Sequence, residues 1–403
     1  MTGEQKVTDT ARSFDRPLFI GVLLLVAFGI VMVYSASAVT AFHDKHSSTY
    51  FLTRHVVYAA LGLIAMLVMS RIDYRIFLRP WVSWGFLIVS FVGLLLCHTG
   101  IGRTINGASR WIGVGPITIQ PAEAMKTALV LWLAYSLAKK AEHIKSFSVG
   151  FLPHLLVPGV VMLACLAQPD FGTAVVIALL MFSLLFVAGA RLGYIMLAGI
   201  AGSTVTYFLV TGSEYRLKRW IAYLDPLSQG NRFGDGYQLS QSLFGFGEGG
   251  VTGVGIGDGL QKLLFLPEAY NDFIASIVGE ELGVIGIFAL LAAVGFVVWR
   301  GVLVAMRARD EFGTYVAFGL SVLIGLQTLA NMGVAMGLLP TKGLTLPFVS
   351  YGGTSLIVAL AAVGILLNIS RGAAARASES SDETWVSRGN LKRRPDGTEE
   401  ATG

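Results

Sequence analysis

The sequence predicts an all-α integral membrane protein that crosses the bilayer about ten times, with both termini in the cytoplasm. Composition is the first observation behind this prediction: the 403 residues are 54% hydrophobic and 14% charged, with a mean hydropathy of +0.67. The second and third are a series of long apolar runs and a bias of basic residues toward alternate connections. A soluble fold of this size could not bury so much apolar surface, so lipid must be its solvent.

The expected spans are apolar runs near the roughly 17 to 25 residues that a bilayer-crossing helix requires. They lie near 17–37, 54–70, 81–98, 121–138, 151–167, 172–189, 191–210, 273–299, 315–337 and 351–369. The connections expected outside are 39–53, 99–120, 168–171, 211–272 and 338–350, of which 211–272 is the longest.

Basic residues set the expected orientation, because short cytoplasmic connections are enriched in Lys and Arg. An even number of spans leaves residues 1–16 and 372–403 in the cytoplasm, on either side of a polytopic membrane domain at 17–371. The polar tail lacks the apolar residues of a core, so we expect it to be disordered. Cleavage after Ala38, in a signal-peptide-like segment, would remove the cytoplasmic anchors Arg12 and Arg16, so we expect the first span to be retained.

Several functional classes are disfavoured by the motifs. Cys97 and Cys165 lie within apolar runs and form neither a metal pattern nor a disulfide framework. The basic residues are dispersed and form no nucleic-acid-binding domain. The glycine-rich run 249–257 lacks the strand and helix of a dinucleotide-binding unit, and no phosphate loop, zinc pattern or serine-hydrolase elbow is present. We therefore expect no organic cofactor and no nucleic-acid partner.

Asp272 closes the long connection at the start of the eighth expected span and is the candidate general base. A carboxylate at the lipid–water boundary is partly desolvated, which raises its pKa toward the range that is useful for proton transfer. The alternative is a helix N-cap, or a first-turn acid that complements the helix dipole.

Other carboxylates lie at membrane depth, where they are costly and often functional. Glu123 and Lys126 share one helix face at i and i+3, and a structural ion pair is their alternative role. Asp170 lies in a tight turn, where helix capping is the alternative. Glu280 and Glu281 point about 80° and 180° away from Asp272 around a helix, so at least one should face the protein interior as a structural anchor.

Basic side chains expected outside would suit a diphosphate or another anionic headgroup. The candidates are Arg103, Arg110, Arg216, Lys218, Arg219, Lys262 and Lys342. For at least half of them, solvation or contact with bulk lipid phosphates is the alternative.

A series of short motifs resembles the SEDS family of polytopic glycosyltransferases, which includes FtsW, RodA and SpoVE. The series covers about Asp15 to Arg371 and consists of Asn106-Gly107-Ala108-Ser109-Arg110-Trp111, Gln120-Pro121-Ala122-Glu123, Gln168-Pro169-Asp170-Phe171-Gly172-Thr173, Lys218-Arg219, Leu266-Pro267-Glu268, Asp272-Phe273-Ile274, Gly279-Glu280-Glu281-Leu282-Gly283, Leu339-Pro340-Thr341-Lys342-Gly343 and Ser350-Tyr351-Gly352-Gly353. The segments 253–257, 261–268 and 341–343 are more similar to the division member FtsW than to the elongation member RodA. Tyr270-Asn271-Asp272 departs from the His-Thr-Asp that is more usual in the family.

The resemblance implies polymerisation of lipid II into glycan strands on the outer face of the bacterial cytoplasmic membrane, at the division septum. A sugar 4-hydroxyl attacks the anomeric carbon of a second sugar and a polyprenyl diphosphate leaves, which requires a base and positive charge. Asp272 is assigned as the base. The residues assigned to substrate or diphosphate are Lys126, Arg216, Lys218, Arg219, Lys342, Glu123, Arg110 and Ser350, and the supporting residues are Asp170, Glu280, Glu281 and Gln168.

The resemblance also implies the molecules that act with this chain. A divalent cation, Mg²⁺ or Mn²⁺, is the one cofactor left open, and its ligands are unknown. The expected partners are lipid II and the growing glycan strand, membrane lipid, a class B penicillin-binding transpeptidase of the FtsI type and other division proteins.

A lipid II flippase or transporter is the main rival, and an elongation-type polymerase and a non-catalytic scaffold are the others. A transporter places its binding residues near the bilayer midplane, on broken helices and often with internal repeats. The candidate residues here cluster toward the outer ends of the spans and no clear repeat is seen, which favours chemistry at the outer face.

Overall fold

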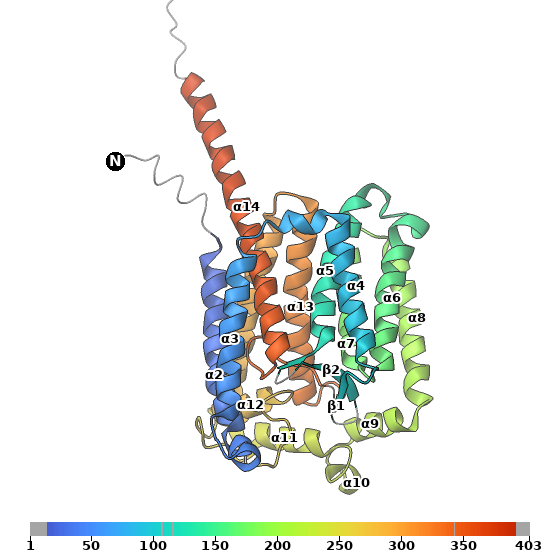
Figure 1. The fold of residues 1–403 in the computed structure, drawn as a ribbon, viewed down its shortest axis with the longest axis vertical. Coiled ribbons are helices and arrows are strands. Elements are labelled where there is room, and N and C mark those ends of the chain that lie inside the picture. The colour runs from blue at the N-terminus through green and yellow to red at the C-terminus, as the bar shows by residue number, and fades with distance from the viewer. Residues whose placement is uncertain (1–13, 106–107, 115–116, 342, 392–403) are drawn as a thin grey trace, which may run out of the picture.

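A computed structural model describes residues 14–105, 108–114, 117–341 and 343–391. Each apolar run expected to span the membrane overlaps one helix of a single bundle (Figure 1). These helices are α2 (Arg16–Lys45), α3 (Tyr50–Met69), α4 (Pro80–Leu96), α5 (Pro121–Lys139), α6 (Leu152–Ala167), α7 (Phe171–Val187), α8 (Leu192–Thr211), α12 (Ile274–Met306), α13 (Glu311–Ala335) and α14 (Gly353–Leu391). The all-α membrane fold class is confirmed.

The helices differ in how strongly their sequence marks them as spans. Along the described part of the chain, seven segments are long and apolar enough to cross a bilayer, and α4 and α7 are shorter apolar helices. α5 has 19 residues but carries Glu123, Lys126 and Lys139. Its apolar signal is weaker for that reason, and the number of spans and their sidedness stay predictions.

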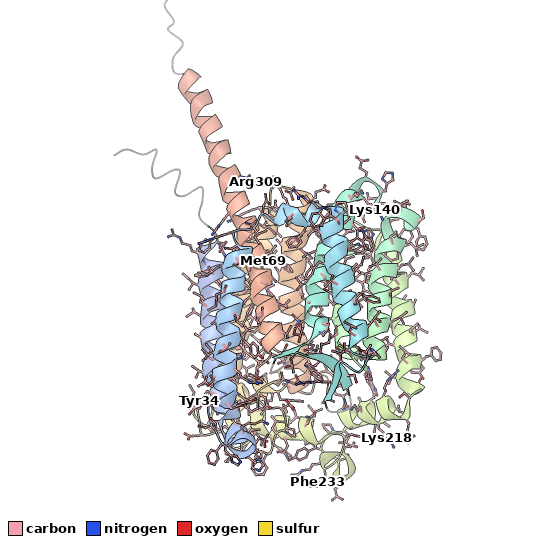
Figure 2. The ribbon with its side chains drawn as sticks, in the orientation of Figure 1. Tyr34, Met69, Lys140, Lys218, Phe233 and Arg309 are labelled. Atoms are coloured by element: carbon pink, nitrogen blue, oxygen red, sulfur yellow. The ribbon has the colours of Figure 1, made fainter. Side chains whose placement is uncertain are left out.

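The two ends of the bundle differ in what they contain. α2 starts, and α14 leaves the bundle, at the same end (Figure 1). Lys140 and Arg309 lie at this end, whereas Lys218 and Phe233 lie at the opposite one (Figure 2). The arrangement agrees with the expected grouping of inner and outer connections.

Helix starts follow from local sequence. Asp15 caps α2 by accepting from the backbone amide of Leu18 at 2.9 Å, and Asp310 caps α13 by accepting from Gly313 at 2.7 Å. Asp15 also accepts from Arg300 Nη2 of α12 at 2.5 Å. One side chain therefore both starts α2 and joins it to α12.

The core lies along α5 and α13. Nearly every residue of α5 is buried, between α4, α7 and α13. α14 packs along α3, and α12 packs against α2 and α13. Short helices connect the longer ones: η1 (Tyr74–Leu78), η2 (Ala141–His143) and the π-helical turn η3 (Phe147–Phe151). η2 directly follows Lys140, at the end of the bundle where α2 starts (Figure 2).

Connections expected as loops contain secondary structure at the end of the bundle marked by Lys218. The 99–120 connection contains an antiparallel sheet in the order β1 (Gly102–Ile105), β2 (Ala108–Val114) and β3 (Ile117–Ile119). The long connection contains α9 (Glu214–Leu224), α10 (Gln229–Arg232) and α11 (Tyr237–Gly249), and α11 packs on α12. We call the end that holds this sheet and these helices the loop end (Figure 1).

α12 is broken at Gly283, which has φ 65° and ψ −164°. Beyond the break, the amide of Val284 donates to the carbonyl of Gly250 at 3.0 Å. Before it, the carbonyl of Glu280 accepts from the amide of Val254 at 3.0 Å. The glycine-rich run therefore supplies the backbone hydrogen bonds that α12 loses at its break.

The same contact explains why this run is rich in glycine. A Cβ at Gly249 would overlap the carbonyl of Gly279, and a Cβ at Gly253 would overlap that of Glu281. Gly253 also has φ 81°, which disfavours any residue with a side chain. The run is a packing surface for α12.

The C-terminal tail begins within α14. Residues from 372 were expected to be disordered, but α14 continues as a helix to Leu391, clear of the bundle (Figure 1). The division into an N-terminal segment, a membrane domain and a tail stays a prediction.

Candidate functional site

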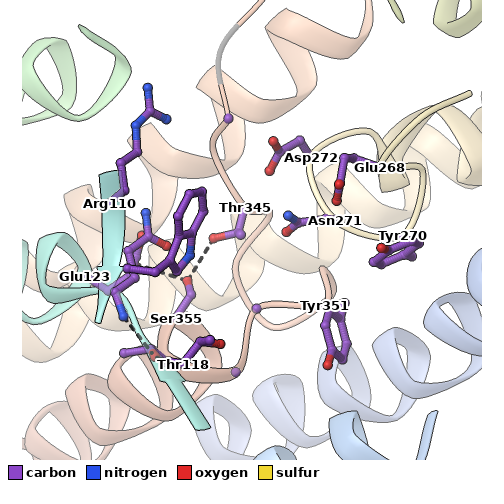
Figure 3. A pocket seen from close by; sticks show the side chains of 16 residues that line it. Arg110, Thr118, Glu123, Glu268, Tyr270, Asn271, Asp272, Thr345, Tyr351 and Ser355 are labelled. Atoms are coloured by element: carbon purple, nitrogen blue, oxygen red, sulfur yellow. Dashed lines mark hydrogen bonds between the residues drawn. The ribbon is translucent and has the colours of Figure 1, made fainter. Parts of the chain in front are cut away.

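A cavity of about 290 Å³ lies at the loop end. Its walls come from the β1–β3 sheet, the start of α5, the segment before α12 and the segment leading into α14. Figure 3 shows Asp272, Glu268 and Asn271 on one side of Thr345, and Arg110 and Glu123 on the other. Carboxylates, a guanidinium and hydroxyl groups therefore face a common space.

Asp272 is partly exposed and lines this cavity two residues before α12. Burial removes water from the carboxyl and, together with the nearby negative charge of Glu268, raises the pKa of Asp272 to about 7. The guanidinium of Arg110 opposes the rise, and the carboxylate of Asp170 adds to it. A carboxylate with such a pKa can accept a proton near neutral pH.

The backbone at Gly343 lies close to both Asp272 and Arg110. A Cβ at this position would lie 2.9 Å from Asp272 Oδ2 and 3.6 Å from Arg110 Nη1. The backbone of the segment before α14 thus passes close to both side chains. A side chain at this position would displace the carboxylate of Asp272.

Glu123 forms the polar wall at the start of α5. Its Oε1 accepts from Lys126 Nζ at 2.8 Å, and its Oε2 accepts from Ser355 Oγ at 3.1 Å and from Gln327 Nε2 at 3.4 Å. Ser355 Oγ is also 2.8 Å from Thr345 Oγ1. This network holds the carboxylate of Glu123 in place and links it to the hydroxyl groups of Ser355 and Thr345, which line the cavity.

Lys126 does not line the cavity, although it was assigned to the diphosphate. The side chain is 1% exposed and its ammonium group is paired with Glu123. The alternative role expected from the sequence, a structural ion pair, describes this geometry. Lys126 lies behind the cavity wall and compensates the negative charge of Glu123.

Arg110 of β2 is held by the turn that precedes α7. Its Nε donates to the carbonyl of Gln168 at 3.3 Å and its Nη2 to that of Pro169 at 2.5 Å, while Nη1 lies 3.9 Å from Asp170 Oδ1. These contacts leave the guanidinium fixed at the cavity wall, where an anion could pair with it.

Asp170 and Gln168 support this turn. Asp170 caps α7 by accepting from the amide of Thr173 at 3.3 Å and from its hydroxyl at 2.8 Å. Gln168 Nε2 donates to the carbonyl of Leu94 in α4 at 2.6 Å. Neither side chain lines the cavity.

Glu280 and Glu281 both face the protein interior in α12. Glu280 Oε1 accepts from the backbone amides of Leu260 at 2.6 Å and Gln261 at 3.1 Å. Glu281 Oε1 pairs with Lys262 Nζ at 2.6 Å. Both acids therefore attach the end of the long connection to α12.

Ser350 lies outside the cavity wall. Its Oγ accepts from the backbone amide of Leu346 at 2.8 Å and the residue is 3% exposed. The assignment of Ser350 to the substrate has no support from this position, since the hydroxyl closes a turn.

The cations of α9 are also away from this cavity. Arg216 Nη1 donates to the carbonyl of Leu209 at 2.9 Å, and Lys218 pairs with Glu214 at 2.8 Å on the surface. Arg219 is exposed on the same helix. Lys342 lies outside the described residues.

Several lining residues were not singled out from the sequence. Glu268, Thr345 and Ser355 lie within or beside the family motifs, but nothing in their spacing indicated that they meet. Tyr270 and Tyr351 form an aromatic side of the cavity, where the ring of Tyr270 stacks on Phe51 at 4.5 Å. Only the folded chain brings these segments together.

Comparison with known proteins identifies the family of this chain. A family model described as a cell cycle protein, FtsW/RodA/SpoVE, matches residues 15–375. A probable peptidoglycan glycosyltransferase FtsW of Geobacter sulfurreducens is 47% identical over 357 residues, covering 89% of this chain and 95% of the relative. Stage V sporulation protein E of Bacillus subtilis is 41% identical over 365 residues, with coverage of 91% and 99%.

Solved structures show the same fold. A chain from a study of how a peptidoglycan synthase complex coordinates polymerization and crosslinking superposes with a TM-score of 0.74 at 27% identity, covering 89% of this chain and 98% of that one. The rod shape determining protein RodA of Thermus thermophilus gives 0.63 at 26% identity, with coverage of 89% and 97%. With its family model, its relatives and its fold in agreement, this chain belongs to the FtsW/RodA/SpoVE family of membrane proteins and is most similar to FtsW.

Proposed function

We propose that this protein is a peptidoglycan glycosyltransferase that polymerises lipid II on the outer face of the cytoplasmic membrane, for septal cell-wall synthesis. The observation that carries the proposal is Asp272, whose pKa is raised to about 7 in a cavity that it shares with Arg110. The reaction needs a base and a positive charge within reach of one another, and both face this cavity. The similarity to FtsW proteins supports the substrate and the septal role.

Asp272 accepts the proton of the acceptor sugar's 4-hydroxyl as that oxygen bonds to the anomeric carbon of the donor. The bond from this carbon to the diphosphate oxygen breaks, and the polyprenyl diphosphate leaves with the bonding electrons. Arg110 pairs with the negative charge that develops there. Glu123, Thr345 and Ser355 supply fixed hydrogen-bonding groups that orient the sugars.

Lys126 contributes indirectly in this account. Its ammonium pairs with Glu123 in the protein interior, where the two charges compensate each other. The α9 cations Arg216, Lys218 and Arg219 act at the surface of the loop end, where they attract the anionic headgroup before it enters the cavity.

A divalent cation fits the oxygen groups of the cavity. Glu268 and Asn271 line it together, although no three His, Cys, Asp or Glu side chains gather as a metal site among the described residues. Mg²⁺ is commonly held by one or two carboxylates together with substrate phosphates. When bound, the cation would neutralise part of the diphosphate's charge. Chelation should then reduce polymer formation, and Glu268→Gln should raise the Mg²⁺ concentration needed to restore it; equal cation dependence in both proteins would reject these ligands.

The partner in this proposal is a class B penicillin-binding transpeptidase of the FtsI type, acting with other division proteins. One structural relative comes from a peptidoglycan synthase complex in which polymerization and crosslinking are coordinated. A polymerase whose product is crosslinked at once would act beside such an enzyme at the septum.

Reconstitution of the wild-type protein tests the proposal. Purified protein in vesicles, supplied with lipid II, Mg²⁺ and the cognate transpeptidase, should form glycan polymer that is resolved by gel electrophoresis. Movement of labelled lipid II across the vesicle membrane without any polymer would favour the flippase. The absence of both polymer formation and lipid II movement would favour the scaffold.

A further inference from the structure

Asn331 of α13 contacts the candidate site from behind. The residue is 1% exposed. Its Nδ2 donates to the carbonyl of Asp272 at 2.8 Å and to the carbonyl of Leu344 at 2.5 Å. Asp272 lines the cavity, and Leu344 lies between the lining residues Gly343 and Thr345. One buried carboxamide therefore joins the segment before α12 to the segment before α14.

Both joined segments line the cavity. They meet again where the amide of Tyr351 donates to the carbonyl of Tyr270 at 3.0 Å. The two contacts therefore hold residues 270–272 of one segment beside residues 344–351 of the other, which include Thr345. Asn331 is the contact at the Asp272 end, where Gly343 comes close to both Asp272 and Arg110.

Space filling does not account for an asparagine here. Asn331 Oδ1 is buried and has no hydrogen-bond partner among the described residues. Burying an unpaired amide oxygen destabilises a protein, and an apolar residue of similar size would avoid that penalty. The two donated hydrogen bonds are what the carboxamide supplies and an apolar side chain could not.

We propose that Asn331 is a positioning residue for the base, fixing Asp272 against the segment at 343–345 so that its carboxylate meets the acceptor hydroxyl. The inference rests on the proposed role of Asp272. Proton transfer depends on alignment, and a displacement of about 1 Å at a reacting group can reduce the rate by about 100-fold. Both hydrogen bonds go to backbone carbonyls, so they act on Asp272 through the placement of these segments.

The test compares Asn331→Ala and Asn331→Ser in the full-length protein with its transpeptidase. Asn331→Ala removes both hydrogen bonds, and kcat for polymer formation should fall about 10- to 100-fold with little change in KM for lipid II. Asn331→Ser keeps one small donor and should recover part of the loss. Thr328→Val is the matched control, because it removes a buried hydrogen bond to Ile324 one turn away on α13, outside the cavity wall.

The split between kcat and KM, and the partial recovery in Asn331→Ser, are readouts that general destabilisation would not change. Thermal unfolding and gel filtration of each variant report whether it is folded.

Three results would overturn the proposal. They are an unchanged kcat in folded Asn331→Ala, an equal loss of kcat in Thr328→Val, and failure of every Asn331 variant to fold, which would make the residue structural. Wild-type polymer formation in the same vesicles keeps these outcomes separate from failure of the proposed function. Full activity of Asp272→Ala would instead reject the base itself.

Discussion

The ammonium of Lys126 lies 2.8 Å from Glu123 Oε1, and the side chains are only 1% and 8% exposed. The other oxygen of the same carboxylate accepts from Ser355 at the cavity wall. The ammonium that the family resemblance assigned to the diphosphate is thus paired with a carboxylate. The pair gives the polar wall a fixed acceptor whose charge is already compensated.

Lys126→Met should destabilise the protein strongly, because it leaves the carboxylate of Glu123 buried without its counter-charge. Loss of one partner of a buried pair typically costs about 3–5 kcal/mol. The double variant Glu123→Gln/Lys126→Met should unfold at a higher temperature than Lys126→Met. Thermal unfolding in detergent measures both, with Lys218→Met of the exposed Glu214 pair as the control. A melting temperature for Lys126→Met equal to that of the wild type would contradict the buried pair.

Polymer formation should increase as pH rises through about 7. Asp272 has its pKa raised to about 7, so below that pH it is protonated and cannot accept the hydroxyl proton. Glu268→Gln removes a negative neighbour and should move the acid limb to lower pH, whereas Arg110→Met removes a positive one and should move it to higher pH. Initial rates from pH 5 to 9 measure the limb. Shifts in the opposite directions would show that another group controls it.

Gly343→Ala should reduce the polymerisation rate at least about 10-fold without preventing folding. The added Cβ would lie 2.9 Å from Asp272 Oδ2, so the carboxylate must move. Gly247→Ala in α11 is the matched control, since a Cβ there meets nothing within 4 Å. Rates at saturating lipid II compare the two variants. If they are equally active, the approach of Gly343 to the base has no catalytic role.

Much of the fold could be predicted from the sequence. Each long apolar run is a helix, because spanning length and hydropathy are local properties of the chain. Strands β1, β2 and β3 were not predicted, because they are only three to seven residues long and too short to carry a strong period. The helices of the long connection were not predicted either, although α9 is amphipathic and carried a usable helical signal. The role of the glycine-rich run 249–257 could not be predicted from its own sequence either, because it depends on the break at Gly283 in α12.

Only those parts of the site that carry a local signal in the sequence could be predicted. Asp272 and Arg110 stood out because charged residues near spans are rare, and both line the cavity. Ser355 and Thr345 are ordinary hydroxyl residues in the sequence and gain significance only through Glu123. Asn331 carried a usable signal, a polar side chain within an apolar span, but its partners are backbone atoms that no motif reveals.

The most direct test of the account is polymer formation by Asp272→Asn, measured beside Asp235→Asn, an exposed acid of the same long connection. Both variants are reconstituted with lipid II, Mg²⁺ and the transpeptidase, and gel filtration confirms that they are folded. The account predicts that Asp272→Asn makes no detectable polymer while Asp235→Asn matches the wild type. Undiminished polymer from well-folded Asp272→Asn would contradict it.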